Sequence, residues 1–175
     1  MRKWFHFLLV TLITLSVLFF HFIIVYTLPY PYDKINILFI YLVFYLLWVQ
    51  SGSVVWVAFL THIFLEAFPG TAFGVTLLSS SLSLLLSYWL YMYYITNRKW
   101  YSASILMMLT LICYRLFYSL FLFIAQRFET NPLDIEWSEL WQLGLWEILL
   151  TSVAFTGVYF LFYKFSKRFH RAVTK

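Results

Sequence analysis

The chain has 175 residues, of which 63% are hydrophobic and only 11% are charged, and its net charge is +5. Soluble domains average about 25% charged residues, so this composition excludes a soluble globule, whose core could not be covered. Apolar residues also form blocks of roughly 20, enough for a helix to cross the ~30 Å hydrocarbon layer of a bilayer. The sequence therefore predicts an all-α integral membrane protein, with a single transmembrane domain over residues 1–175.

Three spans are expected in the first half of the chain. The first covers about 4–28 and ends at Pro29. It is too long for a signal peptide, and no small-residue cleavage site follows it. The turn Gln50–Ser53 divides the next apolar region into spans of about 35–49 and 53–68. Both are at or below the usual lower limit of roughly 17 residues for crossing, so a partly re-entrant hairpin is the alternative.

Three more spans are expected in the second half, at about 72–95, 102–125 and 140–165. The basic turn at 97–99 closes the fourth span. The segment Arg127–Glu139 is the one substantial extramembrane loop expected, and its mixture of acidic and apolar residues is typical of a short interfacial helix.

Charges favour six spans with both termini in the cytoplasm. In that arrangement the inner side carries basic residues and no acid: Arg2, Lys3, Arg98, Lys99, Lys164, Lys167, Arg168, Arg171 and Lys175. The outer side carries five acids and two bases: Asp33, Glu129, Asp134, Glu136, Glu139, Lys34 and Arg127. Basic residues prefer the cytoplasmic side, so we expect a multi-pass protein of the cell inner (cytoplasmic) membrane. The tail from Lys164 should contact anionic lipids rather than nucleic acid.

Four ionisable side chains fall inside predicted spans, namely His62, Glu66, Arg115 and Glu147. A charge near the middle of a membrane helix costs at least ~2.5–3.5 kcal/mol, which makes such residues candidates for pairing or function. The favoured interpretation is an ion pair that joins helices, with Glu147 as the first choice of partner for Arg115 and Glu66 as the second. A substrate or proton site, or contact with a partner helix, are the alternatives.

Neither a metal site nor a catalytic centre is predicted. His62 and Glu66 share a helix face, but a zinc site needs at least three protein ligands, and His21 is the only further candidate. The sequence has no HExxH motif, no pair of intramembrane aspartates and no serine in a glycine turn. A non-enzymatic protein without a cofactor is expected. A lipid-modifying enzyme that uses Arg115 and Glu147 is the alternative.

Small residues mark two helix faces that should pack internally. Close helix approach in membranes favours small side chains spaced one turn apart. The fourth span has Ser79, Ser83 and Ser87 at this spacing, and the sixth has Gly144, Glu147, Thr151 and Ala154 along one face.

The stretch FLEAFPGTAFGVTLLSSSLS, residues 64–83, resembles a motif of the MreD family of bacterial rod-shape proteins. In that family a helix ends in an Asp, and a small-Gly turn and a Pro-Leu-Gly element follow. Here Glu66 takes the acidic position, Pro69-Gly70 the turn and Ala72-Phe73-Gly74 the last element. Glu replaces Asp, Pro replaces the small turn residue, and Ala replaces Pro. The length, six spans and basic C-terminal end are also similar.

This resemblance implies a non-enzymatic membrane scaffold of the cell-elongation machinery. It would bind a bitopic MreC-type partner and influence the peptidoglycan synthase complex and the MreB filament. The surface around Pro69-Gly70 or the loop Arg127–Glu139 would make the contact. The family fold is similar to the substrate-binding subunits of energy-coupling-factor vitamin transporters, which gives the alternative function. That alternative requires a polar pocket, whereas the outer halves of the predicted spans are dominated by Phe, Leu and Tyr.

Overall fold

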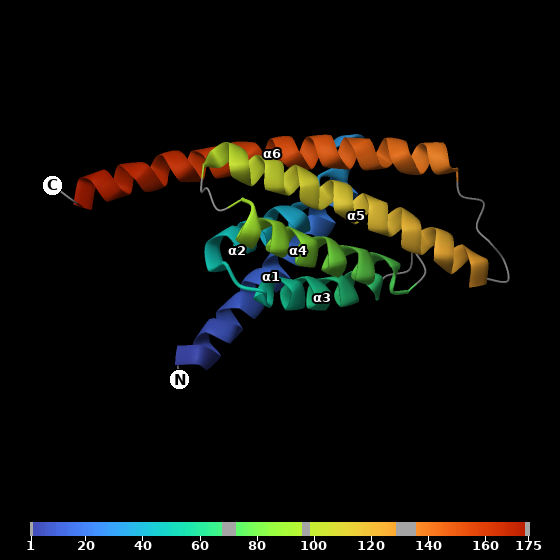
Figure 1. Ribbon diagram of the computed structural model, residues 1–175, viewed down its shortest axis with the longest axis horizontal. Helices are drawn as coiled ribbons and strands as arrows, with labels where there is room; N and C mark the ends of the chain where they lie inside the picture. Colours follow the sequence, from blue (N-terminus) through green and yellow to red (C-terminus); the bar gives the residue numbers. More distant parts are fainter. Residues whose placement is uncertain (1, 68–72, 96–98, 129–135, 174–175) are drawn as a thin grey trace.

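The computed structural model describes residues 2–67, 73–95, 99–128 and 136–173, and its regular elements are all helices (Figure 1). In chain order they are α1 (Arg2–Thr27), η1 (Tyr32–Lys34), α2 (Ile37–Val49), α3 (Ser53–Glu66), α4 (Val75–Tyr93), α5 (Trp100–Phe128) and α6 (Trp137–Val173). The all-α fold predicted from the sequence is confirmed.

Helix length and surface chemistry identify a multi-pass membrane protein. Within the described residues, five helices are long and apolar enough to cross a bilayer, and α3 is apolar but shorter, with 14 residues. Large apolar side chains face outward along these helices: Leu12 is 67% exposed, Leu145 66% and Val153 65%. Soluble monomers rarely expose such continuous apolar surface, because water would drive it into a core or an interface.

Helix α2 forms the centre of the packed core. Its side chains Leu38, Phe39, Leu42, Val43 and Leu46 are all buried. They contribute to a core that also draws residues from α3, α4, α5 and α6: Val54, Ala58, Leu84, Leu106, Met107, Leu111 and Phe155. Helix α4 packs between α3 and α5, and α6 packs along α5.

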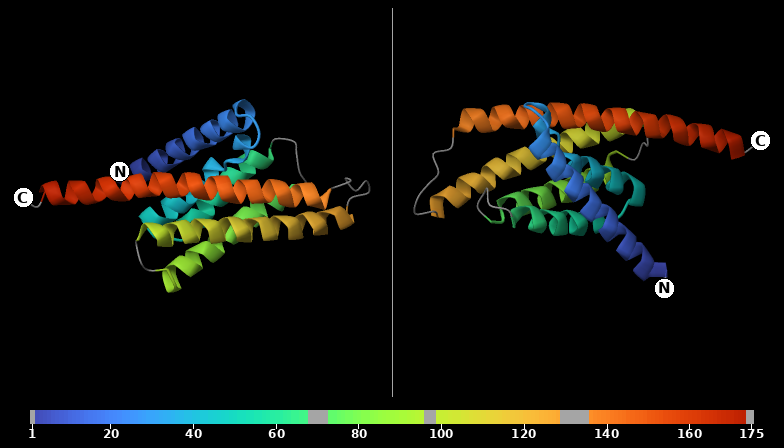
Figure 2. Two further views of the ribbon diagram at one scale, coloured as in Figure 1. Left: turned by 90° about the horizontal axis from the view of Figure 1, so that it is seen from above. Right: turned by 180° about the vertical axis from the view of Figure 1, so that it is seen from behind.

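Helix α1 is attached to this bundle more loosely. It crosses one face obliquely, and its N-terminal end diverges from the other helices (Figure 2). No side chain of Leu8–Thr27 is buried. A hydrogen bond joins α1 to α2, because the hydroxyls of Thr14 and Tyr41 lie 2.9 Å apart. Most of the surface of α1 therefore remains available to lipid or to another helix.

The break between α2 and α3 follows the turn chemistry of the sequence. Gln50 ends α2 in the left-handed conformation with φ 54°, and its N–H donates to the Leu46 carbonyl over 2.9 Å. This geometry is a common helix C-cap, and Gly52 then precedes α3. The polar turn predicted at this point separates two short antiparallel helices.

Helix α6 differs most from its predicted span. It begins at Trp137 and continues to Val173, whereas the expected span covered only 140–165. Lys and Arg are good helix formers, so the helix extends beyond its apolar portion into the basic tail. Trp137 belongs to α6 itself rather than to a separate interfacial helix. The remainder of the predicted loop, 129–135, lies outside the described residues.

The small-residue face of α4 packs internally, whereas that of α6 does so in part. Ser79, Ser83 and Ser87 are buried, and the Ser87 hydroxyl lies 2.7 Å from that of Thr110 on α5. On α6, Gly144, Glu147 and Thr151 are buried but Ala154 is only partly so. The adjacent Phe155 is fully buried instead.

Impermeant cysteine labelling tests the predicted topology in a Cys113→Ala background. A cysteine at Asn131 should react in intact cells and one at Thr174 should not, because the positive-inside rule places the basic tail in the cytoplasm. Both positions lie outside the described residues, so the test depends on the charge pattern alone. Labelling of both cysteines, or of Thr174→Cys alone, would contradict six spans with both termini inside.

Candidate functional site

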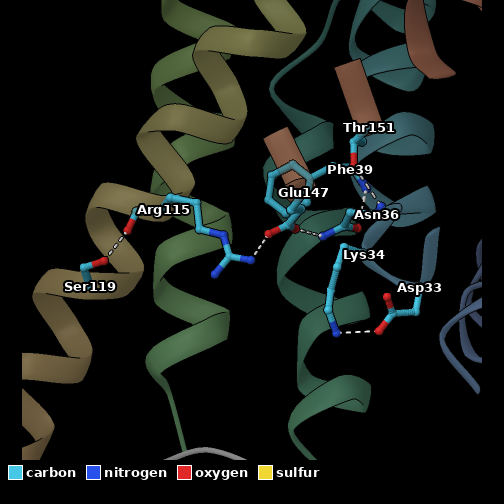
Figure 3. A network of polar contacts seen from close by, with 8 residues as sticks. All are labelled: Asp33, Lys34, Asn36, Phe39, Arg115, Ser119, Glu147 and Thr151. Atoms are coloured by element: carbon cyan, nitrogen blue, oxygen red, sulfur yellow. Dashed lines mark hydrogen bonds and ion pairs between the residues drawn. The ribbon is translucent and has the colours of Figure 1, made fainter. Parts of the chain in front are cut away.

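An ion pair between α5 and α6 lies at the centre of the polar network. Arg115 contacts Glu147, the partner that the sequence favoured, and the two side chains are only 16% and 7% exposed (Figure 3). Gly144 makes room for the guanidinium, since a Cβ at this glycine would lie 3.3 Å from the Arg115 Cδ and Nε atoms. Nearby aromatic rings flank the cation, with the Arg115 Cζ atom 5.8 Å from the Tyr118 ring centroid.

Asn36 extends this network to the start of α2. Its amide Nδ2 donates to Glu147 Oε1 over 2.7 Å, and its backbone N–H donates to the Thr151 hydroxyl over 2.9 Å. Its Oδ1 accepts the N–H of Phe39 and thereby caps α2. The network thus joins three helices. Sequence reasoning missed Asn36, although an Asn immediately before an apolar run is a recognised helix-start signal.

Glu66 lies at the end of α3, as expected, but it contacts the backbone of α4 rather than Arg115. It was the second choice of partner for Arg115, yet its carboxylate accepts the N–H groups of Gly74 and Leu77, each over 2.8 Å. Gly74 is the residue just before α4 and Leu77 lies in its first turn, where unpaired N–H groups and the helix dipole attract negative charge. Glu66 therefore caps the following helix.

Two residues of the segment that resembles the MreD motif, Glu66 and Gly74, contact each other at the start of α4. Gly74 lies just before α4 with φ 95°, a left-handed conformation that a side chain would disfavour. Its N–H is one of the two that bind Glu66. The acid and the last glycine of the motif are therefore in direct contact. Pro69 and Gly70 lie outside the described residues.

His62 is fully enclosed between α3 and α2. Its Nδ1–H donates to the Ala58 carbonyl over 2.8 Å, and its ring contacts Phe39 edge-on. Within the described ranges no three His, Cys, Asp or Glu side chains come together as a metal site requires. These contacts give His62 a packing role in the bundle. His21, the further candidate ligand considered from the sequence, lies on α1.

A polar pocket lies where α5, α6 and η1 meet. Its volume is about 420 Å³, and it is lined by Lys34, Arg115, Tyr118, Glu136, Glu139, Leu140 and Leu143. The predominance of Phe, Leu and Tyr in the predicted spans did not lead us to expect this polar pocket. The lining side chains come from three separate segments, and no local sequence pattern in any of them predicts a pocket.

An apolar groove of about 320 Å³ lies between α1 and α3, with part of α2 at its base. Val10, Leu18, Trp56, Leu60 and Phe64 contribute most of the wall. Trp56 is 71% exposed and Leu60 51% exposed. In a bilayer this groove must be filled by acyl chains or by another apolar segment.

In the described residues, the fold and these features define an all-α multi-pass membrane protein with a buried ion-pair network, a polar pocket and an apolar groove. Comparisons with protein-family models, with curated proteins and with solved structures find no match for this chain.

Proposed function

We propose that this protein is a non-enzymatic scaffold of the bacterial cell-elongation machinery, with six spans in the inner membrane. It binds the transmembrane helix of a bitopic MreC-type partner and links it to the peptidoglycan synthase complex and the MreB filament. The observation that supports this proposal most directly is the groove between α1 and α3.

The groove suits a helix better than it suits a soluble ligand. Its lining is almost entirely apolar, and the described part of α1 contributes no buried side chain to the bundle. In lipid, helices associate by close packing and a few polar contacts rather than by the hydrophobic effect. A loosely packed α1 can adjust to an incoming helix without loss of an internal core.

The groove also leads to the segment that resembles the MreD motif. Phe64 lines its wall, and Glu66 and its cap on α4 follow within one turn. The proposed partner surface around Pro69-Gly70 is contiguous in sequence with this end of α3. The partner helix would occupy the groove, and its adjoining segment would contact the turn.

A second candidate function is supported by the polar pocket. A substrate-binding subunit of a vitamin transporter needs a cavity with several polar groups, and small-molecule sites have volumes of about 300–1,000 Å³. The pocket at Arg115, of about 420 Å³, falls in that range. We rank this function second because the two cations of the pocket, Arg115 and Lys34, each contact a carboxylate, so only part of their hydrogen-bonding capacity is left for a substrate.

Co-purification in detergent with an MreC-type protein tests the scaffold proposal. Leu60→Trp should reduce the amount of bound partner at least about fivefold, since an extra ring in the groove costs ~1 kcal/mol or more of packing. Leu149→Trp is the matched control, because Leu149 is 55% exposed on α6, away from the groove. It should leave binding unchanged.

The outcome also separates the two candidate functions. Loss of binding with both tryptophan variants would indicate a general defect and contradict the groove assignment. Failure of the unmodified protein to bind the partner, together with tight retention of a vitamin-sized ligand, would assign the chain to the transporter class.

A further inference from the structure

The polar pocket is lined by both cations and acids, which come from different elements. Arg115 and Lys34 lie on the side of α5 and η1, whereas Glu136 and Glu139 belong to the N-terminal end of α6. Leu140 and Leu143 supply an apolar surface beside them. Such an arrangement fits a ligand with separated charges and an attached apolar part.

The basic side retains unused hydrogen-bond donors. Arg115 contacts Glu147 through one terminal nitrogen, Nη2, and its side chain also lines the pocket. A guanidinium offers five N–H donors in a planar fork that matches an oxyanion such as phosphate. Lys34 contacts Asp33 over 2.5 Å and has further N–H donors.

The acidic residues give the surroundings of the pocket a net negative charge. Arg115 and Lys34 are each neutralised by an acid, whereas Glu136 and Glu139 are exposed and have no ion-pair partner in the part of the chain that the structure describes. Among the described residues, four carboxylates and two cations therefore line or adjoin the pocket. A purely anionic ligand would be repelled, and a ligand with a protonated amine would be attracted.

We propose that this pocket binds a phosphoethanolamine group, with the primary ammonium held by Glu136 and Glu139 and the phosphate held by Lys34 and the free donors of Arg115. The group can belong to an aminophospholipid headgroup or to a small soluble phosphate ester. The pocket extends from Arg115, within the predicted span of α5, to the N-terminal end of α6, where membrane helices reach the headgroup layer, and its leucines suit the glycerol and acyl portion of a lipid. This occupant is independent of whether the groove between α1 and α3 holds a partner helix.

Native mass spectrometry of the delipidated full-length protein in detergent provides the test. Phosphatidylethanolamine should be retained in preference to phosphatidylglycerol, which lacks the amine, and to phosphatidylcholine, whose amine has no N–H donors. Glu136→Gln combined with Glu139→Gln should reduce retention of phosphatidylethanolamine about tenfold, as expected for the loss of a hydrogen bond between charged groups. It should leave retention of phosphatidylglycerol unchanged or increased.

Lys34→Gln tests the phosphate side without disturbing the buried ion pair at Arg115. It should weaken phosphatidylethanolamine retention, whereas Lys164→Gln, an exposed lysine near the other end of α6, should not. Free phosphoethanolamine distinguishes the sources: displacement of the lipid indicates a site for the soluble ester as well, and no displacement indicates the lipid alone. Equal retention of the three lipids, or unchanged selectivity in the double glutamine variant, would overturn the proposal.

Discussion

Arg115→Leu is expected to lower the free energy of unfolding by about 3–5 kcal/mol, the usual effect of removing one partner of a buried ion pair. Glu147 would then be a buried carboxylate with only the Asn36 amide as a partner (Figure 3). Glu147→Leu should be similarly costly, since the guanidinium of Arg115 would remain without its counter-charge. Thermal unfolding in detergent, followed by tryptophan fluorescence, measures both effects.

Two double variants separate the charge from the hydrogen bond. Arg115→Leu with Glu147→Leu should recover much of the lost stability, because no unpaired charge remains. Arg115→Leu with Glu147→Gln should recover more, since the glutamine carbonyl can still accept from Asn36. Arg127→Leu is the matched control, as Arg127 is exposed at the end of the same helix, and it should change stability little. Double variants as impaired as the sum of the single ones would contradict the pairing.

This ion pair was predictable because so few ionisable residues lie inside the apolar blocks. With a single arginine and two glutamates to consider, the requirement that an intramembrane charge be neutralised leaves few combinations. The all-α fold was predictable for a similar reason, since apolar length alone specifies membrane helices. Helix ends in the headgroup region are less constrained by that length, and α6 accordingly continues past its predicted end.

The remainder of the candidate site depends on contacts between distant segments. Asn36 and Glu147 are separated by 111 residues in the sequence, yet they form a hydrogen bond. The polar pocket combines η1, α5 and α6, and no local pattern in any of them indicates the other two. Glu66 was only the second choice of partner for Arg115, and its contact with α4 was not predicted, because the sequence does not reveal that the N–H groups at the start of α4 face the end of α3.

Glu66→Ala should lower the free energy of unfolding by about 2–3 kcal/mol, more than the usual ~1 kcal/mol for a helix cap, because two N–H groups lose a charged acceptor at once. Glu66→Gln should lose roughly half as much, since its one carbonyl oxygen can accept from either Gly74 or Leu77 but lacks the charge that favours the helix N-terminus. Glu139→Gln, at an exposed acid, is the control and should change stability by less than about 0.5 kcal/mol.

The same variants decide whether the acid of the MreD-like motif acts on the fold or on a partner. If it acts as a cap, partner binding should decline in proportion to the loss of folded protein. The free energy of unfolding of Glu66→Asp should then lie between those of the unmodified protein and Glu66→Ala, because the shorter side chain reaches the two N–H groups less well. Hydrogen exchange should then increase in the first turn of α4 and remain unchanged in α5, which begins at Trp100. A Glu66 variant with unchanged stability and unchanged hydrogen exchange that no longer binds the partner would give the opposite result. It would show that the Glu66 carboxylate contacts the partner rather than the backbone of α4.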